Sequence, residues 1–180
     1  RCDIFAMRTA PIQINNLFPA GTSGVDYYDY IVADPVLIPK DYQKYYSEKV
    51  LYLDVCFPID TMKPKVKNTL NRQDFNLPSD CFIFCCTNSH YKYNPSIFNS
   101  WMKILGKVDG SFLFLSADSE LVKDNLRKEA LARNINSDRL IFAEKRLSFT
   151  MFIERLSLMD LFLDTYPFNG MSSSCDTLWS

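Results

Sequence analysis

The residues best suited to chemistry gather in three short polar segments, each of which follows an apolar run. Segment 88–92 holds the single histidine of the chain and ends in Lys92. Segment 144–148 carries two cations, and segment 166–174 includes three consecutive serines. Cations, hydroxyl groups and free backbone N–H groups all bind anions, so these segments together predict a phosphate or diphosphate site.

The serines lie where a helix is expected to begin. Ser172, Ser173 and Ser174 would stand at its N-terminus, where backbone N–H groups lack partners and the helix dipole is positive. Gly170 would let the backbone approach a ligand closely. Ser173 and Asp176 also have the S-x-x-D spacing of a helix cap, so capping alone remains an alternative. The segment matches neither a P-loop nor a G-x-G-x-x-G motif.

Four other side chains, which lie in or beside these segments, have two interpretations each. Lys92 can neutralise a departing diphosphate without a metal, or it can be a solvated surface lysine. His90 can act as an acid or base, or it can be polar surface. Asp164 and Asp176 can accept hydrogen bonds from a ribose, or they can end a strand and begin a helix.

Apolar runs and amphipathic stretches alternate from residue 81 onward. Continuous apolar runs alternating with amphipathic helices indicate a parallel sheet that is covered on both faces. The carboxyl ends of such strands meet at one edge of the sheet, so the polar segments are expected to converge there. Strands are predicted at 81–87, 111–116, 139–144 and 160–165, and helices at 96–107, 118–134, 148–158 and from Ser173, which is expected to cap the last helix.

The earlier part of the chain is less regular. Strands are predicted within 12–19, 29–34 and 50–55, with helix formers after Pro39. Residues 57–80 are polar and contain three prolines, which is typical of a link between two units. We therefore expect a first unit over residues 1–65, a link over 66–75 and a second unit over 76–180.

Composition excludes several classes of protein. A hydrophobic fraction of 47% predicts a folded core, and a net charge of −1 argues against nucleic-acid or polybasic membrane binding. No apolar stretch approaches the about 20 residues that span a bilayer. Six cysteines without a C-x-x-C pair, and one histidine, argue against a metal site and favour a reduced, cytoplasmic compartment.

Several stretches coincide with one family. Residues 8–34, 45–53, 85–105, 138–143 and 158–180 resemble the catalytic region of the O-linked N-acetylglucosamine transferases, in the style of bacterial and SPINDLY-like members. The A-P-I-Q…G-T-S-G…D-Y and L-D-T…N-G…D-x-L-W blocks carry the resemblance. It implies an α/β fold of GT-B type, with Rossmann-like parallel sheets and flanking helices. The chain would be a fragment, incomplete at both ends, without an initiator Met.

The resemblance also implies an activity. The family moves N-acetylglucosamine from UDP-GlcNAc to Ser/Thr hydroxyls of proteins, with inversion and without a metal or other cofactor. The implied partners are a nucleotide sugar and a protein acceptor, with no nucleic acid and no membrane. A tetratricopeptide array usually lies upstream in such proteins, and the fragment alone is expected to be inactive.

Site residues are carried over from the same resemblance. Lys92 matches the lysine that stabilises the departing diphosphate. Ser172 and Ser173 take the place of a Thr-Thr pair on the phosphates, Leu147 and Arg155 lie beside the base, and Asp176 lies near the ribose. The nucleotide-sugar-binding residues implied in full are Tyr91, Ser89, Leu147, Arg155, Met171, Ser172, Ser173, Asp176, Leu17 and Phe18.

Four positions depart from the family pattern. Met171 and Phe152 stand in place of histidines, and the helical stripe that contains Phe152 predicts a core position for it. Ser89 replaces a glutamine near the phosphates, and Phe18 replaces a glycine of the sugar pocket. Two alternatives therefore stay open: the same fold with GDP-fucose or UDP-glucose as donor, or a degenerate member that binds a nucleotide or partner without turnover.

Overall fold

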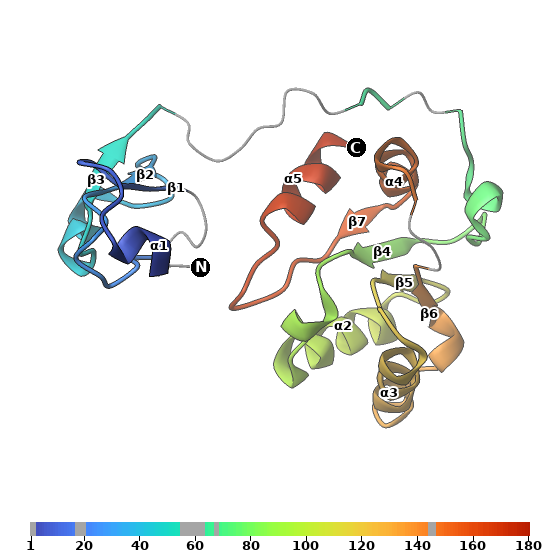
Figure 1. Ribbon diagram of the computed structural model, residues 1–180. Helices are drawn as coiled ribbons and strands as arrows, with labels where there is room; N and C mark the ends of the chain where they lie inside the picture. The colour runs from blue at the N-terminus through green and yellow to red at the C-terminus, as the bar shows by residue number, and fades with distance from the viewer. Residues whose placement is uncertain (1–2, 17–20, 55–63, 67–68, 144–146) are drawn as a thin grey trace. The chain divides into compact units, whose positions relative to one another are not determined.

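The computed structural model of the protein describes residues 3–16, 21–54, 64–66, 69–143 and 147–180. Its backbone divides into two compact units, Arg1–Asp60 and Thr61–Ser180 (Figure 1). The predicted link over residues 66–75 thus falls within the second unit. Leu17 and Phe18 lie outside the described residues.

The first unit is a small parallel sheet. Its strands β1 (Ile14–Asn16), β2 (Tyr30–Ala33) and β3 (Lys49–Tyr52) pair in the order β1-β2-β3. A short helix α1 (Asp3–Ala6) precedes them, and the helix predicted after Pro39 is the 3-10 helix η1 (Lys40–Tyr45). Its buried core consists of Ile31, Ala33 and Ile38.

A buried carboxylate fastens the glycine-containing turn of this unit to β3. Glu48 is 1% exposed and accepts hydrogen bonds from the Ser23 N–H and the Thr22 hydroxyl, both at 2.7 Å, and from the Ser23 hydroxyl. Burial by itself would raise the pKa of Glu48, but the hydrogen bonds from Ser23 and Thr22 outweigh it and lower that pKa to about 2. The ionised carboxylate therefore stabilises the turn.

In the second unit, strands and helices alternate regularly, and they form the parallel sheet that the sequence predicts. The strands pair in the order β6-β5-β4-β7, and every pair is parallel. The strands are β4 (Ile83–Cys86), β5 (Phe112–Leu115), β6 (Leu140–Phe142) and β7 (Leu161–Phe162). The helices are α2 (Pro95–Lys107), α3 (Glu120–Leu131), α4 (Phe149–Leu156) and α5 (Ser172–Trp179), with 3-10 turns η2 (Arg72–Phe75), η3 (His90–Lys92) and η4 (Ser137–Arg139).

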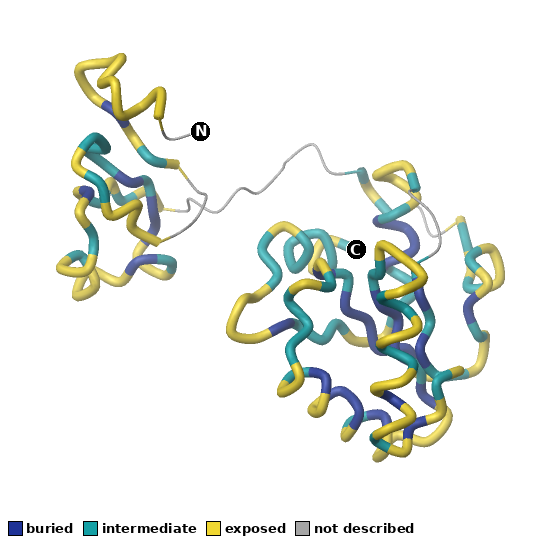
Figure 2. Tube along the Cα trace, turned by 60° about the horizontal axis from the view of Figure 1, so that its bottom comes forward, coloured by how far each residue is buried: buried dark blue, intermediate teal, exposed yellow. Residues whose placement is uncertain are grey.

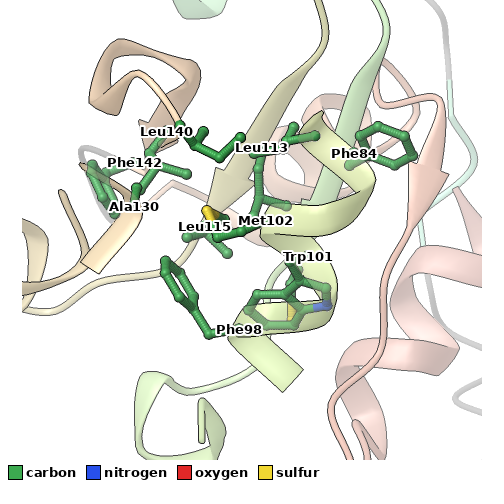
Figure 3. Packing of buried hydrophobic residues seen from close by; sticks show 12 residues of the cluster. Phe84, Phe98, Trp101, Met102, Leu113, Leu115, Ala130, Leu140 and Phe142 are labelled. Carbon is green, nitrogen blue, oxygen red and sulfur yellow. The ribbon is translucent and has the colours of Figure 1, made fainter. Parts of the chain in front are cut away.

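Alternate residues of the strands enter two cores on opposite faces of this sheet. Phe84, Leu113 and Leu115 pack with residues of α2 such as Trp101, as Figure 3 shows. Cys85 and Phe114 face the other way and pack with Ile83 and Leu77. In Figure 1, α2 and α3 lie on one side of the sheet, and α4 and α5 lie on the other. Burial on both faces explains why the strands read as unbroken apolar runs.

Polar side chains cap three helices of this unit. The Asn94 side chain caps α2, with Pro95 as its first residue, Ser119 caps α3, and Ser148 caps α4. One core prediction is wrong in part. Phe152 is half-buried and stacks on Phe149, while the next residues of α4, Ile153 to Leu156, are buried. Figure 2 shows buried stretches of the chain in the middle of the second unit.

An ion pair closes the amino end of the second sheet. Arg72 of η2 donates to the Cys81 carbonyl at 2.6 Å and pairs with Asp160 at 2.7 Å. Asp160 in turn accepts from the Ile83 N–H at 2.7 Å. These bonds bind η2 to the starts of β4 and β7. Within the described ranges, no helix is long and apolar enough to cross a membrane.

Candidate functional site

The strand order creates one switch point, between β4 and β7. The chain runs outward from β4 through β5 to β6 and then returns to place β7 on the other side of β4. Ligands of open parallel sheets bind at the carboxyl ends of the strands where the order reverses. The segments that follow β4 and β7 are the polar segments that the sequence singled out, and the structure brings these two together.

Asn88, two residues after β4, is the buried centre of this contact. Its side chain is fully enclosed at 0% exposure. The amide Nδ2 donates to Asp164 Oδ1 and to Thr165 Oγ1, both at 2.8 Å. Its Oδ1 is buried and has no hydrogen-bond partner among the described residues. The amide therefore joins the ends of β4 and β7.

The Asp164 carboxylate is occupied by hydrogen bonds within the loop that follows β7. Its Oδ1 accepts from the Gly170 N–H at 2.7 Å and the Thr165 N–H at 2.8 Å, and Oδ2 accepts from the Asn169 amide. Burial alone would raise the pKa of Asp164, but these bonds and that from Asn88 hold it below its ordinary value. Of the two readings of Asp164, the strand-end role is the one seen.

Lys92 reaches the same loop from the β4 side. Its Nζ donates to the Asn169 carbonyl at 2.8 Å and lies 4.0 Å from the centroid of the Phe168 ring. Tyr91 is 71% exposed, with its ring 6.3 Å from that of Phe168. His90 instead approaches Asp118, with Nδ1 at 3.3 Å from the carboxylate. Lys92 thus contacts the backbone three residues before the start of α5.

The start of α5 corrects one prediction. The helix begins at Ser172 with Met171 at the N-cap position, and no side chain caps it there. Ser173 is the second helical residue and so cannot be the cap. The Cys175 N–H makes the first helical bond, to the Met171 carbonyl at 3.2 Å. The N–H groups of the preceding residues therefore point out of the helix end, as an anion site requires.

Close packing explains Gly170. A methyl group at this position would overlap Asn88 Oδ1 and would lie 2.6 Å from the Ser174 hydroxyl oxygen. The Ser174 hydroxyl donates to the Gly170 carbonyl at 2.8 Å. The absence of a side chain at Gly170 therefore lets the backbone of this loop pack against Asn88. The sequence predicted only that Gly170 would let the backbone approach a ligand.

Leu147 and Arg155 meet elsewhere, at a hollow of about 240 Å³. Arg155 is 7% exposed, and its guanidinium lies 5.0 Å from the Phe114 ring and 6.0 Å from the Phe152 ring. Burial lowers the pKa of Arg155. Its Nε is buried without a hydrogen-bond partner in the described part of the chain. The lining of this hollow includes no residue of the Lys92 or α5 segments.

The remaining predicted residues flank the contact between the two segments. Ser89 is exposed, and its carbonyl accepts from the Lys92 N–H at 3.0 Å. Met171 and Asp176 are half-buried. Among the described residues, no group of three or more His, Cys, Asp or Glu side chains is placed to hold a metal ion.

Sequence reasoning missed the polar residues that hold the site. Asn88 and Thr165 are buried, and Asn94 donates to the Tyr166 carbonyl at 2.6 Å while it also caps α2. Their position along the chain was the signal that could have identified them. Asn88 and Thr165 each follow an apolar strand by two or three residues, and a polar side chain at such a place needs partners from a neighbouring strand end.

Comparisons with known proteins agree with this architecture. A family model described as Glycosyl transferase family 41 matches residues 1–69 and 60–180. The chain is 37% identical to the probable UDP-N-acetylglucosamine–peptide N-acetylglucosaminyltransferase SEC of Arabidopsis thaliana, over 100% of this chain and 19% of that protein. It is 26% identical to the probable enzyme of the same description, SPINDLY, of Eustoma exaltatum subsp. russellianum, over 98% of this chain and 19% of that protein.

A solved structure extends the likeness to three dimensions. The K341M mutant of the Thermobaculum terrenum O-GlcNAc transferase superposes with a TM-score of 0.79 at 25% identity, over 97% of this chain and 33% of that one. The expected GT-B-type α/β fold is thereby confirmed. The chain spans about a fifth of the length of the curated relatives it matches, each of which it covers to 19%.

Proposed function

Because the chain belongs to glycosyltransferase family 41, we propose that it forms part of an enzyme that transfers a sugar from a nucleotide sugar to Ser/Thr hydroxyls of proteins. The donor is UDP-GlcNAc, the sugar nucleotide in the names of the relatives, and the acceptor is a protein. The acceptor hydroxyl attacks the anomeric carbon while the diphosphate leaves, with inversion.

The observation that carries this proposal is the meeting of a cation and an uncapped helix start at the switch point. The Lys92 ammonium is bonded to Asn169, three residues before Ser172. Negative charge grows on the diphosphate as it departs, and a pre-positioned ammonium group and free amides stabilise that charge. In this proposal the protein groups supply the neutralisation, and no metal ion or cofactor is required.

The other residues take roles around the same donor. Ser172 and Ser173 bind the phosphates with their hydroxyls and amides, Tyr91 lies beside the sugar, and Asp176 binds the ribose. The hollow at Leu147 and Arg155 receives the base, since Arg155 offers an unpartnered buried Nε and the hollow is walled in part by aromatic rings. Ser89 and Met171 complete the donor site.

We also propose a cytoplasmic location for the protein. The thiols of Cys81, Cys85, Cys86 and Cys175 are free, as expected for a reducing compartment. Tetratricopeptide repeats elsewhere in the protein that carries this chain would present the acceptor.

Calorimetric titration of the chain with UDP and with GDP tests the proposal. We expect UDP to bind and Lys92→Ala to weaken that binding by about tenfold or more, because the charged contact is lost. Lys103→Ala is the matched control, since Lys103 is an exposed lysine on α2 away from the switch point. Tighter binding of GDP than of UDP would indicate a GDP-sugar as the donor. Nucleotide binding without sugar transfer by the longer protein would indicate a degenerate member of the family. Binding of neither nucleotide would overturn the proposal.

A further inference from the structure

Three side chains from the segment after β4 hold the loop after β7, residues 164–170, at separate points. Asn88 bonds to Asp164 and Thr165, Lys92 bonds to Asn169, and Asn94 bonds to Tyr166. The 164–170 loop leads directly into α5. Its position therefore decides where the first amides of α5 lie relative to Lys92.

We infer that Asn88 is a positioning residue for the diphosphate site, which acts through the 164–170 loop; this inference rests on the proposed function. Burying an amide is costly unless its polar atoms find partners. Asn88 is fully buried and leaves Oδ1 without a partner in the described chain, so the two bonds from Nδ2 account for the presence of an amide there. An apolar side chain would avoid the unpaired oxygen and lose both bonds.

The first of these bonds controls the start of α5. Asn88 Nδ2 donates to Asp164 Oδ1, and the same oxygen accepts from the Gly170 N–H at 2.7 Å. Gly170 is two residues before Ser172 and packs so closely on Asn88 that a methyl group would overlap Oδ1. The amide therefore sets the place of the helix start both by a hydrogen-bond relay and by direct contact.

The second bond controls the surroundings of Lys92. Asn88 Nδ2 also donates to Thr165 Oγ1, and that hydroxyl donates to the Phe168 carbonyl at 2.6 Å. The Phe168 ring lies 4.0 Å from the Lys92 ammonium, and the next residue supplies the carbonyl that Lys92 binds. The Asn88 amide thus fixes the position of the α5 start relative to Lys92.

The experiment compares Asn88→Ala with Ile83→Val in the full chain. Ile83 is buried at the opposite end of β4 and touches none of these bonds, so its variant provides a loss of stability without a loss of positioning. We expect Asn88→Ala to raise the Kd for UDP by about tenfold or more, since small misplacements at a site are costly, while Ile83→Val stays within about twofold. Equal effects of the two variants on Kd, or an Asn88→Ala value within twofold of the parent, overturn the inference.

Two further measurements test the role of Asn88 if Asn88→Ala does not fold or if the parent chain does not bind a nucleotide. Thr165→Val keeps the side-chain volume and removes only the hydroxyl relay, so it replaces Asn88→Ala if that variant does not fold, and the same increase in Kd is expected. Hydrogen exchange of the ligand-free chain over residues 164–171 should speed up in Asn88→Ala and remain unchanged in Ile83→Val. If the parent binds neither UDP nor GDP, the proposed function fails, and the exchange result alone confirms or refutes the control of the loop by Asn88.

Discussion

Replacing Glu48 by Gln should remove most of the acid sensitivity of the first unit. The Glu48 carboxylate is 1% exposed and is held by the Ser23 N–H, by the hydroxyls of Thr22 and Ser23, and by Ser47 at 3.2 Å. These donors favour the ionised form and lower the pKa of Glu48 from 4.5 to about 2. The stabilisation is therefore present above the unfolded value of 4.5 and is lost as the pH falls through about 2.

The size of the effect follows from the two pKa values of Glu48. The interval between 4.5 and about 2, at about 1.4 kcal/mol per pH unit, corresponds to about 3 kcal/mol of unfolding free energy. Between about pH 6 and about pH 2, the free energy of unfolding of this unit should fall by about 3 kcal/mol more in the parent than in Glu48→Gln.

The assay must report on the first unit alone. Both tryptophans, Trp101 and Trp179, lie in the second unit, so pulsed hydrogen exchange over residues 27–34 in a urea series is the suitable readout. Asp41→Asn, which removes an exposed carboxylate of η1, is the control and should follow the parent. The reasoning about Glu48 is refuted if parent and Glu48→Gln lose equal stability over this pH range.

Three further predictions concern the second unit. Gly170→Ala should destabilise it by about 1–3 kcal/mol in urea unfolding followed by tryptophan fluorescence, because the new methyl group overlaps Asn88; an unchanged midpoint would contradict this. Lys92→Ala should abolish sugar transfer by the longer protein that carries the chain without changing its circular dichroism, and a full rate of transfer would exclude Lys92 from the mechanism. Arg72→Ala should cost about 3 kcal/mol in the same urea assay, since it breaks the pair with Asp160 and several carbonyl bonds; a loss below about 0.5 kcal/mol would show that solvent satisfies those groups equally well.

Local sequence patterns were sufficient for the elements of the second unit. The runs around Ile83, Leu113 and Leu140 are apolar on both faces because both faces are covered, and this makes them recognisable without any partner. The start of α4 at Ser148 was predictable for a similar reason, because its cap is a contact between residues three apart.

The start of α5 shows where such patterns fail. Ser173 has a capping pattern, yet the helix begins one residue earlier because the 164–170 loop is held by side chains more than 70 residues away, with Asn88 and Thr165 separated by 77 positions. The roles of Asn88 and Asp164 in holding this loop could not be predicted either. In the sequence each is a single polar residue after a strand, and the contact between them exists only once the two strand ends lie side by side.

The sequence by itself determined the strands, most helix starts, the parallel sheet and the polar segments that lie at its edge. These depend on the period of burial and on contacts within one turn, which neighbouring residues encode. Only the tertiary structure decided which polar groups meet, that Lys92 reaches the loop before α5, and that Asn88 joins β4 to β7. Those contacts depend on the order of strands in the sheet, and that order is set by the packing of distant segments rather than by any local pattern.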